Sequence, residues 1–394
     1  MKHPLMLSIF VGLLPLFGQE DVPVFGYYES QYMGREIGDN TCQLYSNKLR
    51  IDLEGDLSDR VTFGANINYI TYNGMTAWNI LELLDPFAAA EVQGGTESHF
   101  IVHFQDRNYL DNAFLKLAFD KFDLTAGKQQ VSLGTGYAWN PLDIFNVKDL
   151  VDPTYEQPGH NAVRIDLPLT LDYMVTALFS PEDTWENSDK MLTVKGRLGH
   201  FDYSLTAAEK LWVLTDFTQV DPGTDYFIQL PERRRLYGFS AAGELLGLGL
   251  WSEYGYNVME SSNDFYELVI GSDYTIDSGT YLMAEWFHYS IGKTAVAEYG
   301  LNDWMRSYYN QRKAISKDQL YLYLMHPLTD LLMAGLSTIY NISDGSLALV
   351  PMLSYSFSDN VEIMGYLSYN NGEMGSVFAS DQGPGGTLRA RIYF

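Results

Sequence analysis

Residues 48–69 read Lys-Leu-Arg-Ile-Asp-Leu-Glu-Gly-Asp-Leu-Ser-Asp-Arg-Val-Thr-Phe-Gly-Ala-Asn-Ile-Asn-Tyr. Apolar residues occupy every second position in 48–54 and again in 61–69, on either side of a short connection at 57–60. Successive side chains of a β-strand point to opposite faces, so each half predicts a strand with one apolar and one polar face.

The same alternation recurs along the chain, and charged residues stand in the middle of many of these segments. The segments are about ten residues long, enough for a tilted strand to cross a hydrocarbon layer, whereas strands of soluble proteins average roughly five or six residues. We therefore expect about 18 strands, with 16 as the alternative count. Their predicted positions are 23–33, 43–56, 61–73, 109–120, 122–133, 162–169, 171–181, 189–198, 201–211, 234–245, 247–258, 263–274, 279–290, 318–326, 330–341, 346–357, 361–371 and 386–394.

The connections between these segments alternate in length. Those that follow even-numbered strands are tight, whereas most that follow odd-numbered strands are long: 74–108, 134–161, 212–233, 291–317 and 372–385. This parity on an even number of strands is typical of membrane barrels. The predicted fold class is all-β: a transmembrane antiparallel up-and-down β-barrel with short periplasmic turns and long extracellular loops.

The first residues have the layout of a secretory signal peptide. Lys2 provides a positive charge, residues 5–17 are largely apolar, and Gly18 is a small residue at which cleavage can fall. After this segment no apolar window of about 18 residues recurs, so spanning helices are not expected. We expect residues 1–18 to be a signal peptide and residues 19–394 to form a single barrel domain.

The final segment, Leu388-Arg-Ala-Arg-Ile-Tyr-Phe394, alternates apolar and polar residues and ends in an aromatic residue. In this respect the chain resembles the porin-like β-barrels of the Gram-negative outer membrane. The resemblance implies a location in the cell outer membrane, contact with membrane lipid, and a sorting signal at Phe394 that is read by the barrel assembly machinery. By the same analogy the protein would be a homo-trimer or a monomer.

Charge excludes one class of partner. The chain has 25 Lys and Arg against 50 Asp and Glu, a formal net charge of −25. A polyanion would be repelled, so nucleic-acid binding is not expected.

Charged side chains in mid-strand should face the lumen, because the lipid-facing side penalises them. We expect the basic pore-lining residues to be Lys48, Arg50, Lys116, Arg164, Lys195, Arg197, Arg389 and Arg391. The acidic residues expected on the lumen side are Asp52, Glu54, Asp166, Glu253, Glu267, Glu285 and Glu362. Alternatively, these charges only pair with one another and fill the lumen.

The connection at 134–161 is the candidate constriction loop. Its apolar side chains, Trp139 among them, would be exposed in a loop that extended into water, and folding into the barrel mouth would bury them. Its acidic residues would then face the basic wall: Asp143, Asp149, Asp152 and Glu156. The alternative is an external loop that packs on its neighbours. Residues 77–84 and 302–313 are expected to be partly helical, as lids or adhesive surfaces.

No motif of an enzyme stands out. The chain has no Gly-x-Ser-x-Gly, no His-Glu-x-x-His and no phosphate-binding Gly-Lys-Ser/Thr. His99 and His103 are four residues apart, but no predicted element brings them together as a metal site. We therefore expect no catalytic residues, no metal and no cofactor.

The predicted function is passive diffusion of small hydrophilic or charged solutes through the barrel, with ion preference set by opposed charges. Two alternatives remain. One is a transporter specific for a sugar, an organic acid or a fatty acid, which the aromatic residues expected in the lumen favour: Phe25, Tyr27, Tyr281, Phe287 and Tyr366. The other is a surface adhesin or structural barrel.

Overall fold

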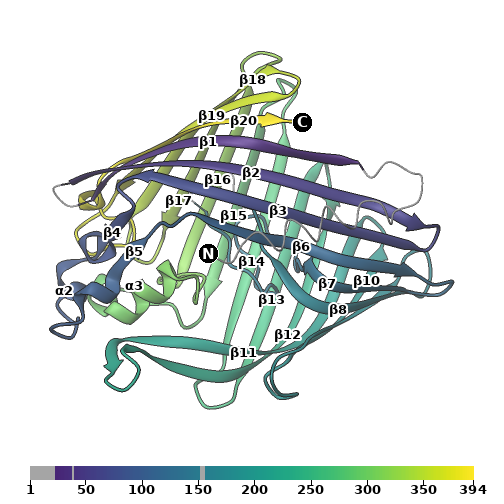
Figure 1. Cartoon of the computed structure of the whole chain (residues 1–394), viewed down its shortest axis with the longest axis horizontal. Helices are drawn as coiled ribbons and strands as arrows, with labels where there is room; N and C mark the ends of the chain where they lie inside the picture. Colours follow the sequence, from purple (N-terminus) through teal and green to yellow (C-terminus); the bar gives the residue numbers. More distant parts are fainter. Residues whose placement is uncertain (1–22, 38–39, 151–155) are drawn as a thin grey trace, which may run out of the picture.

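A computed structural model describes residues 23–37, 40–150 and 156–394. Within them, 18 strands form one closed antiparallel sheet, and β4 (Ala77–Asn79) pairs with β5 (Ile101–His103) in a small separate sheet (Figure 1). The predicted signal peptide, residues 1–18, lies outside the described residues. Among the helices that the structure describes, none is long and apolar enough to span a bilayer.

Each strand of the large sheet pairs with its neighbour along the chain. The first nine are β1 (Val24–Ile37), β2 (Asn40–Ser58), β3 (Val61–Gly74), β6 (Arg107–Ala118), β7 (Asp123–Gln130), β8 (Gly159–Pro168), β9 (Met174–Ser180), β10 (Asp189–Leu198) and β11 (Phe201–Asp221). The other nine are β12 (Tyr226–Leu245), β13 (Leu248–Met259), β14 (Phe265–Thr275), β15 (Tyr281–Tyr289), β16 (Asp318–Pro327), β17 (Leu332–Asn341), β18 (Leu347–Ser358), β19 (Val361–Asn371) and β20 (Gly385–Tyr393).

The first and last strands close the barrel. β1 pairs antiparallel with β20 from Tyr27 opposite Tyr393 to Arg35 opposite Gly385. Beyond the last strand, the Phe394 N–H donates to the Gly26 carbonyl over 3.1 Å, and the Gly26 N–H donates back over 3.0 Å. The sheet therefore has no unpaired edge along this seam, as a barrel in lipid requires.

The two faces of the sheet are inverted relative to a soluble protein. Large apolar side chains are exposed on the outside, among them Leu115, Ile165, Leu192, Leu205, Ile270, Leu322, Leu353 and Leu388. Polar side chains on the opposite face are buried, among them Asn66, Asn68, Thr193, Glu253, Asn257, Glu267 and Glu285. An apolar exterior around a polar interior is the pattern that a lipid environment selects.

The connections differ between the two rims. At the rim where β1 begins and β20 ends, the turns are short: 59–60, 119–122, 169–173, 199–200, 246–247, 276–280, 328–331 and 359–360. The long connections, at 75–106, 131–158, 290–317 and 372–384, share the other rim. The structure thus confirms the predicted fold class and the count of 18 strands. All four long connections lie at one rim, as predicted, but that rim also has short connections at 181–188, 222–225, 260–264 and 342–346.

The predicted loop at 212–233 is wrong. β11 and β12 continue through it as a hairpin that turns at 222–225. The extension is stabilised by packing, because Phe217 is buried and its ring centroid lies 5.1 Å from that of Phe227 and 5.3 Å from that of Tyr309. The hairpin packs against a helix of another connection, and such a long-range contact is not visible in the local sequence.

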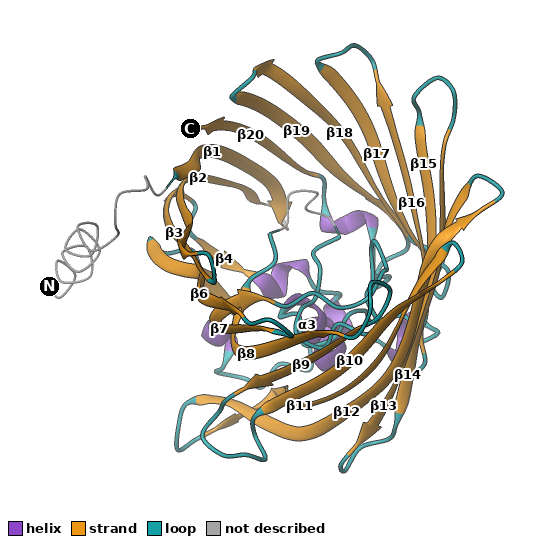
Figure 2. Cartoon of the chain, turned by 90° about the vertical axis from the view of Figure 1, so that its right-hand side faces the viewer, coloured by secondary structure: helices purple, strands orange, loops and turns teal. Residues whose placement is uncertain are grey.

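Short helices from two long connections fold into the barrel mouth (Figure 2). The first connection holds η2 (Ile80–Leu83), α2 (Pro86–Ala89) and η3 (Glu97–Phe100), and the second holds η4 (Val296–Glu298) and α3 (Leu301–Tyr308). Their apolar faces meet in one buried cluster that includes Phe100, Leu301, Trp304 and Met305. The predicted helical character of 77–84 and 302–313 is therefore confirmed in part, since Ala77–Asn79 is a strand. The last long connection holds η5 (Ser380–Gln382).

The outward side of β11 provides a test of the membrane-facing surface. Leu205 is 54% exposed on this side, opposite Phe239 of β12. Replacing Leu205 with Arg should lower the free energy of unfolding from lipid vesicles by about 2–4 kcal/mol, because a cation would be placed in hydrocarbon. Leu205→Met is the matched control and should be close to neutral. Equal stability of the Arg variant would show that lipid does not cover this face.

Candidate functional site

The described parts of the connection at 131–158, residues 131–150 and 156–158, lie inside the barrel. Trp139 and Leu142 are 3% and 0% exposed, and Phe145 is also buried. Trp139 stacks on Phe287 of β15 with ring centroids 5.1 Å apart and planes at 9°. An added Cβ at Gly238 of β12 would lie 2.0 Å from the Leu142 side chain, so a larger residue there would force this buried side chain to shift. We call residues 131–150 and 156–158 the lumen segment.

A buried carboxylate on β15 holds one part of the lumen segment. Glu285 accepts hydrogen bonds from three successive backbone N–H groups, those of Tyr137 at 2.6 Å, Ala138 at 2.9 Å and Trp139 at 2.8 Å. The Trp251 indole N–H donates to the same carboxylate over 2.6 Å. Successive N–H groups that converge on one anion form a strong and geometrically specific attachment.

A second carboxylate, on β13, holds the neighbouring turn. Glu253 accepts from the backbone N–H groups of Thr135 and Gly136, and from that of Leu142 at 3.3 Å. The Asn140 side-chain amide also donates to it over 3.3 Å. Glu253 and Glu285 are both 0% exposed, so the lumen segment supplies the hydrogen bonds that water cannot.

The other end of the lumen segment meets the basic wall of the seam. The Glu156 carboxylate lies 2.6 Å from Lys48 Nζ, 3.3 Å from Arg50 Nη1 and 3.4 Å from Arg391 Nη2. The Tyr27 hydroxyl donates to it over 2.6 Å. These partners come from β1, β2 and β20, so the cluster exists only because the barrel is closed.

The charge of Glu156 is stabilised by these contacts. Burial alone would raise the pKa of this carboxyl, but hydrogen bonds from Lys48 and Tyr27 and the charges of Lys48 and Arg50 outweigh it, and the pKa is lowered. Glu156 is therefore ionised at neutral pH and reduces the positive charge of the wall it touches.

Two other predicted acidic residues of this segment, Asp143 and Asp149, lie elsewhere. The expectation that Asp143 faces the basic wall is wrong, because it is buried in a turn and accepts from the backbone N–H groups of Phe145 at 2.9 Å and Asn146 at 3.0 Å. A short polar side chain that binds its own following backbone is a common turn device. Asp149 lines a cavity in the lumen, and Asp152 lies outside the described residues.

The eight predicted basic residues divide into two groups. Lys48, Arg50 and Arg391 contact Glu156, and Arg389 and Arg391 contact Glu29 of β1 at 3.5 and 2.6 Å. The remaining four are Lys116, Arg164, Lys195 and Arg197. Three of these pair with nearby Asp123, Asp166 and Asp202 at 2.7–2.8 Å, and Lys195 lies opposite the buried Ser204. The structure therefore brings only half of the predicted set together.

The connection at 290–317, which holds α3, is linked to the lumen segment. Lys313, which follows α3, donates to the Asn140 carbonyl and to Glu267 of β14, the latter over 3.1 Å. Glu267 lies 3.4 Å from Arg234 of β12. Burial lowers the pKa of the Lys313 ammonium. This buried polar network joins two connections that are far apart in sequence.

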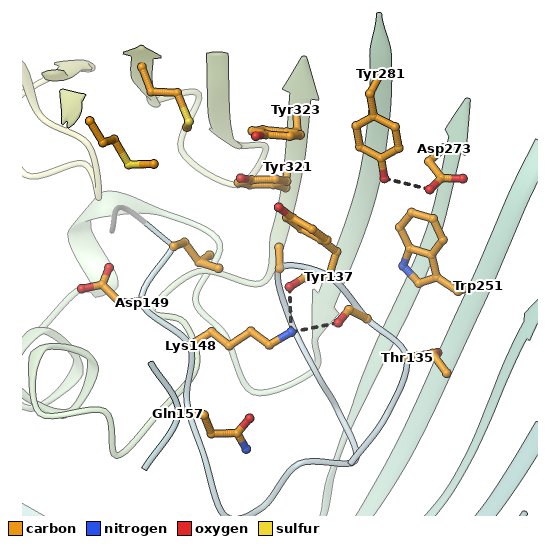
Figure 3. A pocket seen from close by; sticks show the side chains of 15 residues that line it. Thr135, Tyr137, Lys148, Asp149, Gln157, Trp251, Asp273, Tyr281, Tyr321 and Tyr323 are labelled. Carbon is orange, nitrogen blue, oxygen red and sulfur yellow. Dashed lines mark hydrogen bonds between the residues drawn. The ribbon is translucent and has the colours of Figure 1, made fainter. Parts of the chain in front are cut away.

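A cavity of about 600 Å³ remains between the lumen segment and the barrel wall from β13 to β19 (Figure 3). It is lined on the segment side by Thr135, Tyr137, Lys148, Asp149 and Gln157, and on the wall side by Trp251, Asp273, Tyr281, Tyr321, Tyr323, Met352 and Met364. Sequence reasoning anticipated only Tyr281 among these wall residues. The alternation of Tyr321 and Tyr323 with leucines in β16 was the signal that could have found two more.

Sequence reasoning also missed the anchoring role of Glu253 and Glu285, although it placed both in the lumen. Their isolation among apolar and aromatic positions of the same strands was the available signal. Among the described residues, no group of three or more His, Cys, Asp or Glu side chains is arranged to hold a metal ion.

Comparison with solved structures supports the barrel fold. No protein-family model matches the chain, and no curated protein sequence matches it. Among solved structures, it is similar to OccAB4 of Acinetobacter baumannii, with a TM-score of 0.57 and 12% identity over 96% of this chain and 99% of that one. This similarity confirms the β-barrel fold.

Two further structures align over most of the chain. OmpT, an outer membrane protein of Vibrio cholerae in its trimer form, gives a TM-score of 0.47 and 12% identity over 95% of this chain and 99% of that one. A variant of the Rhodobacter blastica porin gives 0.47 and 12% over 95% and 100%.

The attachment of the lumen segment can be tested by hydrogen exchange. In Glu285→Ala, the amides of residues 137–139 should exchange at least about tenfold faster, because hydrogen bonds to a charged group contribute roughly 1.5–3 kcal/mol each. Glu362→Ala, on β19, is the control and should leave these amides unchanged. Unaltered protection in Glu285→Ala would show that the carboxylate does not hold the segment.

The lowered pKa of Glu156 predicts a pH dependence. Since the folded pKa lies below the ordinary value of 4.5, the stability that Glu156 contributes is complete above that value and is lost as pH falls through the lowered pKa. The difference in unfolding free energy between the native protein and Glu156→Gln should follow this course. A difference that disappears at a pH above the ordinary value would contradict the assignment.

Proposed function

We propose that this chain is a porin-like channel of the cell outer membrane, through which small hydrophilic solutes diffuse. The observation that carries the proposal is the lumen segment, which is fixed to one wall by Glu253 and Glu285 and reaches the opposite wall through Glu156. A barrel of 18 strands otherwise encloses a wide aqueous channel. A segment fixed in this way narrows the channel at a defined place.

The charges near Glu156 give the channel an ion preference. Four cationic side chains, Lys48, Arg50, Arg389 and Arg391, are grouped there with three carboxylates, Glu29, Asp52 and Glu156. The cluster has one more positive charge than negative charges (4 − 3 = 1). Fixed charges at a constriction bias which ions pass, so we infer a modest preference for anions.

Contact with the barrel assembly machinery through Phe394, and assembly as a homo-trimer or monomer, remain predictions from the resemblance. Phe394 is 55% exposed at the short-turn rim and completes the seam through its backbone, which leaves its side chain accessible. We propose a channel rather than an enzyme because the polar groups grouped in the lumen serve to hold the lumen segment in place.

The proposed function is tested by current recordings. Purified, refolded protein is added to a planar bilayer under a KCl gradient, and its fold is verified by heat-modifiable migration in gels. We expect discrete conducting steps and a reversal potential that is shifted from zero toward the chloride equilibrium potential. Folded barrel that produces no steps would overturn the channel proposal.

Substitution at the cluster tests the origin of the preference. Glu156→Gln removes one negative charge and should move the reversal potential further toward the chloride equilibrium potential. Lys48→Met should move it in the opposite direction. Glu186→Gln, at an exposed site in the connection between β9 and β10, is the matched control and should have no effect. Identical reversal potentials in all variants would place the selectivity elsewhere.

A further inference from the structure

The cavity beside the lumen segment has an aromatic surface that the channel proposal leaves unexplained. Tyr137, Trp251, Tyr281, Tyr321 and Tyr323 line it, and Figure 3 shows the tyrosine rings gathered around one space. Tyr137 is 48% exposed, whereas the other described aromatic residues of the lumen segment, Trp139 and Phe145, are buried. Exposed aromatic surface at a defined place commonly marks a binding site.

The tyrosine rings form a continuous track. Tyr321 and Tyr323 alternate on β16, with centroids 6.4 Å apart and planes at 14°. The Tyr137 ring lies 6.0 Å from each of them, and Tyr281 of β15 extends the track with a centroid 6.2 Å from that of Tyr323. The track therefore joins the wall of the barrel to the lumen segment across the cavity.

Charged groups at the cavity already have partners within the protein. Lys148 Nζ donates to the backbone carbonyls of Gly136 at 2.9 Å and Tyr137 at 2.7 Å. Asp273 accepts from the Tyr281 hydroxyl over 2.7 Å. A charged solute would have to displace these contacts, whereas a neutral solute would not.

The remaining surface suits a solute with both apolar and hydrogen-bonding faces. Tyrosine rings provide apolar area, their phenol hydroxyls provide polar groups, and Met352 and Met364 add adaptable apolar contacts. The C–H faces of a sugar ring pack on aromatic rings while its hydroxyls bind polar groups. The volume of about 600 Å³ lies within the range of small-molecule sites.

We propose that this cavity is a binding subsite for a neutral carbohydrate of mono- or disaccharide size. The inference rests on the proposed function for the route by which the sugar arrives and leaves. Binding itself requires only the folded barrel with its lumen segment in place. The subsite gives the channel a preference for one class of solute in addition to its ion preference.

Calorimetry tests the subsite independently of conductance. Detergent-folded, full-length protein is titrated with maltose, cellobiose and sucrose, and separately with benzoate as an anionic aromatic probe. At least one disaccharide should bind, and the double substitution Tyr137→Ala and Tyr323→Ala should weaken its affinity about tenfold or more. Tyr254→Ala, on the outer face of β13, is the control and should bind as the native protein does.

The proposal is overturned if no disaccharide binds, if the double variant binds unchanged, or if benzoate binds in place of the sugars. Heat-modifiable migration verifies that each variant is folded, and Tyr137→Phe with Tyr323→Phe retains the rings as a milder variant. Sugar binding without conductance would refute the channel and support the subsite. Conductance without sugar binding would support the channel and refute the subsite.

Discussion

The hydrogen-bond closure between β1 and β20 is the constraint on which the rest of the structure depends. In hydrocarbon every backbone polar group needs a partner within the protein, so the sheet must have no edge. The ladder from Tyr27 to Arg35, completed by Gly26 and Phe394, meets this requirement. Closure in turn fixes which side chains face lipid and which face the lumen. It also brings β2 and β20 to either side of β1, which assembles the basic wall.

A wide lumen creates a second requirement. A chain segment that enters it must be attached to the barrel wall by interactions that replace those with water. The lumen segment meets this need at two places of different chemistry. Glu253 and Glu285 accept hydrogen bonds from its backbone N–H groups. Near the other end of the segment, Glu156 forms ion pairs with cations of the opposite wall. Backbone N–H groups are independent of side-chain identity, so side chains such as Tyr137 remain available to face the cavity. The attachment and the solute-facing surface are therefore separable within one segment.

Sequence alternation was sufficient to predict the barrel, its strands and its parity, because a period of two is a local property. The alternation also predicted that Lys48 and Arg50 face the lumen and that their neighbours in sequence face lipid. It could not predict which basic residues meet Glu156, since Arg391 arrives only through closure. Asp143 was assigned to the wall because its charge was visible in the sequence, whereas its turn hydrogen bonds were not. The hairpin through 212–233 was missed for a similar reason, as its outer half is stabilised by contacts with α3.

The most direct test of the central claim, that the lumen segment borders the conducting path, is a single-channel recording during covalent modification. A Tyr137→Cys variant in a Cys42→Ser background is treated with a charged, water-soluble thiol reagent, and Leu171→Cys at the short-turn rim is the control. The account predicts that modification at position 137 reduces the conductance of open channels and that modification at 171 does not. Complete labelling at position 137 with unchanged conductance would contradict it.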